Sequence, residues 1–298
     1  MPQQSDSIIN WVGPFSKQAV AQAAQMACVL EVCAPKPGNV NRLHDFTDTH
    51  FEDFLLSAIA IGPAISEADH VGVGQTIWRA IHDTRRVVQS NTNLGMVLLL
   101  APLAKACLAV GDLRENLRRV LVSLTVEDTR RTYEAIRLAQ PGGLGQTSLA
   151  DVAEEPSVTL YQAMALAQER DSIAREYVTD FAITFEIGYP ALREAWHLAN
   201  NYANAIVQCY VTLLARVPDT LIARKRGAET ATQVSYQAAE TLALGGALTS
   251  QGQRALAELD RRLRNERHNL NPGTTADLTT AAIFLLLLRE QPFDSVQA

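Results

Sequence analysis

Three observations predict that this chain folds as an all-α protein. Alanine is abundant, whereas aromatic residues make up only 6% of the 298 residues, a balance that favours closely packed helices over sheet. Apolar residues recur at three- and four-residue steps, as they do on one face of a helix. Clean alternation of apolar and polar residues, the pattern of a half-buried strand, is almost absent. We expect one compact multi-helix domain over residues 1–298, with a structured core from 10 to 290 and mobile tails.

The helices follow one another along the chain. Residues Gln18–Val32, Phe51–Ile65 and Leu113–Leu124 each place apolar side chains on one stripe at helical spacing. Residues Ala191–Val217 can hold one long helix. The Ala281–Leu288 segment is apolar on all sides, which is typical of a helix that runs through a core. We therefore expect a buried C-terminal helix.

Proline, glycine and capping residues mark the breaks between these helices. Pro35–Asn39 cannot be helical, because two prolines and a glycine remove a donor or free the backbone. Thr125 and Asp128 predict a helix start, with an acid facing the positive end of the helix dipole. Pro141–Gly145 ends another helix and opens a loop to about Pro156, whose length is ordinary for a surface excursion.

Charge and cysteine content exclude several classes of protein. The chain has 26 Lys and Arg against 32 Asp and Glu, so no global positive field draws it to nucleic acid or to an anionic membrane. Its apolar runs are far shorter than the roughly 20 residues of a membrane span, and its first ten residues lack a secretory pattern. Four scattered cysteines without a CxxC pair indicate free thiols. We expect a soluble, cytoplasmic protein, and base rates alone suggest a homodimer.

The Pro35–Asn39 break is the first candidate site. Gly38 lies between Lys36 and Asn39, so backbone N–H groups are exposed beside a cation, an arrangement that suits phosphate oxygens. A helix terminator with a solvated lysine is the alternative interpretation.

Histidine and carboxylates follow a few residues later. His44 and Asp45 are adjacent, with Asp48 close by, and such groups can perform general acid–base chemistry or hold a divalent cation. Asp48 or Thr49 can equally cap the helix that begins near His50.

Small polar residues precede the next apolar helix. Asn91, Thr92 and Asn93 come before Gly95, so two carboxamides lie beside free N–H groups at the positive end of a helix dipole. This pattern suits an anion or a ribose, because an ordinary cap needs only one such residue.

A basic run lies in the C-terminal third. Arg224, Lys225 and Arg226 are consecutive cations in an acidic protein, which suits a polyphosphate. Such a run is also common on a plain solvated face.

The final helix begins with another glycine-containing segment. Asn271, Gly273, Thr274 and Thr275 precede Asp277, a pattern that fits contact with an anion or a metal, or an elaborate cap. The chain has no GxxxxGK[ST], no GxGxxG after a strand, no GxSxG and no HExxH. The five polar segments therefore predict an all-α site for a phosphorylated ligand.

In this order, the segments resemble the triphosphoribosyl-dephospho-CoA synthase family over residues 20–290. The family's Pro-Lys-Pro-Gly, His-Asp, Phe-to-Ser-Ala helix, Asn-Thr-x-x-Gly and Asn-Pro-Gly-[Ser/Thr]-[Ser/Thr]-Ala-Asp-Leu motifs correspond to Pro35–Gly38, His44-Asp45, Phe54–Ala58, Asn91–Gly95 and Asn271–Leu278. Members that serve citrate or malonate lyase read His-Lys where this chain has Asn93-Leu94. The chain thus looks like a divergent branch that lacks one candidate triphosphate contact.

The resemblance implies a transferase that moves the triphosphoribosyl group of ATP to a ribose hydroxyl of dephospho-CoA and releases adenine. Asp45 would be the base, with His44 beside it, and Mg²⁺ would be held among Asp45, Asp48 and Asp277. ATP would contact residues of the polar segments: Lys36, Gly38, Asn39, Asn91, Thr92, Asn93, Gly95, Arg224, Lys225, Arg226, Asn271, Gly273, Thr274 and Thr275. Nine of them are expected to converge on one polar cavity: Lys36, Gly38, Asn91, Asn93, Gly95, Asn271, Gly273, Thr274 and Thr275. Two alternatives stay open: a related enzyme that acts on another ribosylated or pterin-type cofactor precursor, and a non-catalytic nucleotide-binding protein.

Overall fold

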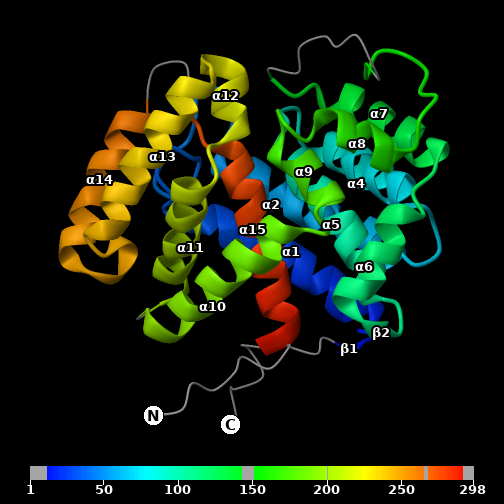
Figure 1. The fold of residues 1–298 in the computed structure, drawn as a ribbon, viewed down its shortest axis with the longest axis horizontal. Helices are drawn as coiled ribbons and strands as arrows, with labels where there is room; N and C mark the ends of the chain where they lie inside the picture. The colour runs from blue at the N-terminus through cyan, green and yellow to red at the C-terminus, as the bar shows by residue number, and fades with distance from the viewer. Residues whose placement is uncertain (1–11, 143–150, 200, 265–267, 291–298) are drawn as a thin grey trace.

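The computed structural model, which describes residues 12–142, 151–199, 201–264 and 268–290, confirms the all-α class (Figure 1). Its α-helices are α1 (Lys17–Cys33), α2 (Phe51–Ala60), α3 (Gly62–Ser66), α4 (Val73–Val87), α5 (Leu94–Cys107), α6 (Leu113–Val122), α7 (Val126–Ala139), α8 (Leu160–Ala167), α9 (Ser172–Val178), α10 (Tyr189–Leu198), α11 (Tyr202–Arg216), α12 (Thr220–Arg226), α13 (Ala228–Ala243), α14 (Ser250–Leu263) and α15 (Gly273–Glu290). A π-helical turn η1 (Thr184–Gly188) and a 3-10 turn η2 (Gly246–Leu248) complete the helical elements. Two-residue strands β1 (Val12–Gly13) and β2 (Gly111–Asp112) pair antiparallel, with Val12 opposite Asp112.

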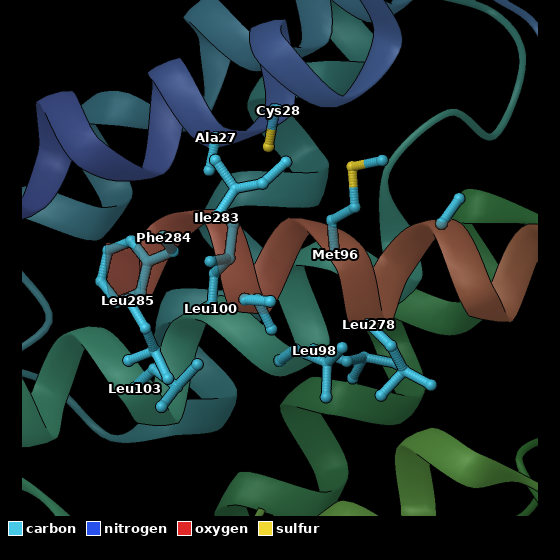
Figure 2. Close-up of a cluster of buried hydrophobic side chains, with 14 of the residues drawn as sticks. Ala27, Cys28, Met96, Leu98, Leu100, Leu103, Leu278, Ile283, Phe284 and Leu285 are labelled. Atoms are coloured by element: carbon cyan, nitrogen blue, oxygen red, sulfur yellow. The ribbon is translucent and has the colours of Figure 1, made fainter. Parts of the chain in front are cut away.

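The C-terminal helix α15 is buried, as its apolar sequence predicts. It packs against α1, α5, α10 and α11, and every residue from Leu278 to Leu288 is buried. In Figure 2, Ile283 points toward Ala27 and Cys28 of α1, while Leu285 lies near Leu103 of α5. Because all sides of α15 contact other helices, its surface can be apolar throughout.

Two groups of helices flank α15. Helices α10 to α14 pack against one another on one side, and α4 to α9 do so on the other (Figure 1). Buried apolar residues from α1 to α15 form one continuous hydrophobic cluster, which joins the two groups. The first turns of α15 therefore lie between them, and this placement positions the site described below.

Two of the expected helices are interrupted. The Phe51–Ile65 segment forms α2 and α3, which meet at Ile61 because Gly62-Pro63 opens a new helix with proline in its first turn. The 191–217 segment forms α10 and α11, because the side chain of Asn201 accepts a hydrogen bond from the Asn204 N–H and caps a second helix. A single long helix was therefore the wrong prediction there.

Other local predictions are confirmed. Thr125 caps α7: its Oγ1 accepts from the Asp128 N–H, and Asp128 Oδ2 accepts from the Thr125 N–H at 2.9 Å. Helix α7 ends at Ala139, before Pro141. Residues 143–145 of the Pro141–Gly145 segment and both predicted tails lie outside the described residues. The single-domain prediction stays a prediction.

By length and composition, no single described helix could cross a membrane. Helices α11 and α12, which are bent by 54° relative to each other, meet that criterion only when they are taken as a pair.

Candidate functional site

A cavity of about 910 Å³ lies where several helices begin or end near one another. Its walls come from the first residues of α5 and α15, from α12, from α7 to α9, and from the loop after α1. In Figure 1, α12 and the α7–α9 group lie on opposite sides of the start of α15. Polar residues gather at the helix starts, whereas α7 and α8 contribute apolar ones such as Ile136, Leu160 and Met164.

The glycine-containing segments meet at this cavity. A Cβ atom added at Gly95 would overlap the carboxylate of Asp277, so the start of α5 lies directly against the start of α15. At Gly38, which has a φ of +78°, an added Cβ atom would lie 3.1 Å from Pro272 Cδ. The loop after α1 therefore also contacts the segment that leads into α15, and glycine is needed where these chains approach closely.

Many of the residues singled out from the sequence line the cavity. They come from all five polar segments, and their roles as ligands stay predictions: Asn39, Asp48, Asn91, Thr92, Asn93, Gly95, Arg224, Lys225, Asn271, Gly273, Thr274 and Asp277.

The start of α5 is held by its own polar residues. Asn91 Oδ1 accepts from the Leu94 N–H at 3.2 Å, and Asn93 Nδ2 donates to Thr84 Oγ1 at 3.0 Å. The Thr92 hydroxyl lies 2.5 Å from that of Ser57 in α2. The side chain of Asn91 thus caps one N–H of the first turn. The residues around this turn line the cavity wall.

The start of α15 differs from the expectation at Thr275. Asp219 Oδ2 accepts hydrogen bonds from both the N–H and the hydroxyl of Thr275, at 2.7 and 2.8 Å. Its Oδ1 accepts from the N–H groups of Leu221 and Ile222, so one buried carboxylate caps both α12 and α15. Thr275 is therefore engaged with a protein carboxylate and does not line the cavity. This corrects the expectation that it converges there.

Lys36 and Gly38 are also placed differently from the expectation. The Lys36 ammonium, 1% exposed, lies 3.0 Å from Glu31 Oε1 and donates to the carbonyl oxygens of Glu31 and Ala34. The Gly38 N–H donates to Asp260 Oδ1 at 2.8 Å. Neither residue lines the cavity, because both are occupied by contacts within the protein.

His44, Asp45 and Arg226 are the remaining corrections. The backbone of His44 pairs with that of Asn41 in a tight loop, and its side chain is exposed. Asp45 Oδ1 accepts from the Phe51 N–H at 2.8 Å, so this carboxylate caps α2. Arg226 is exposed at the last turn of α12. None of the three lines the cavity, so the structure does not bring the expected base to it.

Carboxyl groups gather near the starts of α5 and α15. Burial raises the pKa of Asp277 well above its usual range, and the nearby carboxylates of Glu31, Asp219 and Asp171 raise it further. Asp277 receives no hydrogen bond or ion pair from the part of the chain that the structure describes. No group of three or more His, Cys, Asp or Glu side chains is gathered as a metal cage among those same residues.

Sequence reasoning missed several lining residues. Arg170 adds a cation, and Phe46 stacks on His268 with ring centroids 4.0 Å apart. No local pattern marks them, because each is brought to the cavity by tertiary packing.

Buried polar atoms without partners point to the same place. Among the described residues, they belong to Glu31, Ser90, Thr132, His268 and Asn271, and all five residues line the cavity. The Lys36 ammonium lies near Glu31 Oε1, so the other four residues hold the buried polar atoms that lack any partner among the described residues. Each unmet group costs about 1–3 kcal/mol, so their concentration here indicates that a polar ligand completes the site.

The fold and the cavity together define an all-α protein with a polar cavity built at the starts of two helices. The chain belongs to the family described as ATP:dephospho-CoA triphosphoribosyl transferase (CitG), whose profile matches residues 17–294, and it is therefore a transferase.

Two relatives agree with this assignment. A protein of Pseudomonas savastanoi pv. phaseolicola, provisionally named 2-(5''-triphosphoribosyl)-3'-dephosphocoenzyme-A synthase, is 26% identical over 290 residues, which is 90% of each chain. A solved structure from Archaeoglobus fulgidus, provisionally named triphosphoribosyl-dephospho-CoA synthase, is 31% identical. It superimposes with a TM-score of 0.61 and covers 78% of this chain and 97% of its own.

Proposed function

We propose that this chain transfers the triphosphoribosyl group of ATP to a ribose hydroxyl of dephospho-CoA and releases adenine. Beyond the family assignment, one observation carries the proposal: segments from five parts of the chain meet at one cavity that holds the unpartnered buried polar atoms. The acceptor oxygen forms a bond to the anomeric carbon of ATP's ribose, and the bond from that carbon to adenine breaks. The triphosphate stays on the product.

The triphosphate is assigned to the starts of α5 and α15. Helix N-termini offer N–H donors and a positive dipole to phosphate oxygens. Arg224, Lys225 and Arg170 line the same cavity and supply positive charge, although Arg224 also pairs with Asp171 at 2.6 Å. Guanidinium groups can bind phosphate oxygens in pairs, and lysine acts as a point charge.

Mg²⁺ fits the carboxylates at this end of the cavity. Mg²⁺ is usually held by one or two carboxylates together with substrate phosphates, so a closed protein cage is not required. Asp277 is half-buried near other carboxylates whose mutual repulsion a divalent cation would relieve, and Asp48 also lines the cavity. Asp277 and Asp48 are therefore the residues that would hold the ion, which would neutralise charge on the triphosphate when bound.

The apolar wall offers room for the second substrate. Ile136 of α7, Leu160 and Met164 of α8, and Ile173 of α9 line this part of the cavity. An apolar surface next to a polar one suits a molecule with a nucleotide at one end and a long, largely uncharged arm at the other, as dephospho-CoA has.

Product analysis tests the proposal. Purified protein is incubated with ATP, Mg²⁺ and dephospho-CoA, and products are separated and identified by mass. Free adenine and a product heavier than dephospho-CoA by one triphosphoribosyl group are expected. ADP would indicate a kinase, and unchanged nucleotides would indicate a binding protein; either result overturns the proposal.

Location and assembly follow the same reasoning. We place the enzyme in the cytoplasm, where ATP and Mg²⁺ are available, and the four cysteines are free thiols in agreement with a reducing compartment. Homodimer formation stays a prediction.

A further inference from the structure

Phe46 and His268 form a stacked aromatic pair at the cavity. Their rings lie 4.0 Å apart between centroids with an angle of 17° between planes, and both residues line the cavity. Phe46 comes from the loop between α1 and α2, and His268 from the segment that leads into α15. A planar heteroaromatic ring is the ligand group that such an aromatic pair favours, since stacking needs a matching π-face.

The ring nitrogens of His268 are also able to take part in proton transfer. Of the chain's six histidines, His268 is the one that lines the cavity. Both of its ring nitrogens are buried, and neither has a hydrogen-bond partner within the described ranges 12–142, 151–199, 201–264 and 268–290. Its backbone has a φ of +48°, a left-handed conformation that carries a local energetic cost. Imidazole is the side chain that most often exchanges protons near neutral pH.

Asp277 is placed for another task. Asp277 lies against Gly95 at the helix starts assigned to the triphosphate, whereas His268 lies beside the ring of Phe46. Asn271, three residues after His268, also has a buried side-chain amide oxygen without a partner among the described residues, and such an oxygen can accept from an exocyclic amino group.

We propose that the adenine of ATP lies against Phe46 and edge-on to the His268 ring, and that His268 donates the proton that adenine needs as it leaves. This assignment rests on the proposed function. As the bond between the anomeric carbon and N9 breaks, its electron pair moves to the purine, and an imidazole N–H of His268 gives its proton to a purine ring nitrogen. Neutral adenine departs, the acceptor hydroxyl releases its proton to solvent as its oxygen bonds the anomeric carbon, and His268 is reprotonated from solvent.

The magnitude of the effect follows from general acid catalysis, which typically contributes 10²–10⁴-fold. His268→Asn keeps a polar planar side chain but cannot supply a proton near neutral pH. Its turnover with ATP should fall by about 10²–10⁴-fold. ATP with Mg²⁺ should still raise its melting temperature, which shows that the variant is folded and binds its donor.

A second donor separates proton donation from a structural role. The triphosphate of 6-chloropurine riboside carries a base that leaves more easily without protonation. His268→Asn should therefore lose much less activity with this donor than with ATP. An equal loss with both donors would assign His268 to packing alone, and an unchanged rate with ATP would overturn the proposal outright.

Two further variants complete the experiment. Added imidazole should partly restore adenine release by His268→Ala, and absence of rescue together with equal losses counts against the assignment. Phe46→Leu should raise KM for ATP more than it lowers kcat, because stacking acts in the ground and transition states alike. His197→Asn, at an exposed position of α10, is the matched control and should behave as wild type.

The wild-type protein distinguishes the two levels of the argument. If it frees no adenine from ATP under any of these conditions, the proposed function is wrong. If it frees adenine and His268→Asn does so at the same rate, the function stands and only the role of His268 is wrong.

Discussion

Lys36 and Lys225 occupy two basic segments with the same expected role, and the fold uses them in opposite ways. Lys36 is buried against Glu31 at the end of α1, where its ammonium also donates hydrogen bonds to carbonyl oxygens at the end of that helix. Lys225 is exposed at the end of α12, lines the cavity and has no ion pair with any described residue. A cation whose charge is matched inside the fold stabilises structure, whereas a cation left unmatched at a cavity is available to a ligand.

The same contrast separates two carboxylates. Asp45 is exposed and caps α2, whereas Asp277 is half-buried at the cavity without a partner among the described residues. Four predictions test whether a partner inside the fold is what distinguishes structural residues from ligand-binding ones.

The largest expected effect is at Asp277. Asp277→Asn should lower turnover by about 10²-fold or more and abolish the thermal stabilisation that ATP gains from Mg²⁺, because the metal's charge neutralisation is worth several kcal/mol. Turnover is measured as adenine release. Asp45→Asn is the matched control and should stay close to wild type. If Asp45→Asn loses activity and Asp277→Asn does not, the division drawn here is wrong.

Removal of Lys36 should mainly affect stability. Lys36→Met leaves Glu31 buried without its cation, which costs about 3–5 kcal/mol of the free energy of unfolding. Urea denaturation measures this loss, and the double variant Lys36→Met/Glu31→Gln should recover much of it. Lys17→Met removes an exposed pair with Asp69 and should cost less than about 1 kcal/mol. A similarly small cost at Lys36 would contradict its structural role.

A third prediction concerns Glu176, another group matched inside the fold. Its buried carboxylate accepts hydrogen bonds from the Ile183 and Thr184 N–H groups and the Thr184 hydroxyl, yet burial dominates and raises its pKa to about 7. The folded state therefore holds this proton more tightly than the unfolded chain does. The resulting stability is fully present below about pH 4.5 and is lost as the pH rises through 7, by at most about 3 kcal/mol.

Urea unfolding at pH 5 and pH 7.5 checks this pH dependence. Glu176→Gln should flatten the decline in stability between the two values, whereas Glu240→Gln, exposed on α13, should keep the wild-type decline. An unchanged decline in Glu176→Gln would assign the pH dependence to other groups.

The smallest effect is expected at Lys225. Lys225→Met should raise KM for ATP about tenfold, or about 1.4 kcal/mol, because one charge-assisted phosphate contact is lost. Its kcat and its unfolding free energy should stay near wild type, since the contact exists in ground and transition states and the side chain is exposed. A loss of stability without a change in KM would show that Lys225 resembles Lys36 after all.

Local pattern was sufficient for the helices and for part of the site. The cap at Thr125, the buried α15 and the polar start of α5 at Asn91 all follow from side chains within one or two turns of each other. The pattern failed at Asn201, where an apolar stripe continues across a capping residue that begins a new helix.

The sequence by itself determined the helical class and which segments carry polar groups at helix starts, because helical spacing and capping depend on neighbours along the chain. Only the tertiary structure decided that Glu31 pairs with Lys36, that Asp219 accepts a hydrogen bond from Thr275 at the start of α15, and that Phe46 stacks on His268. Two of these contacts join residues from distant parts of the chain, and the third depends on burial of both charges. The partner and burial of a polar group decide whether it serves the fold or a ligand, and neither can be read from spacing alone.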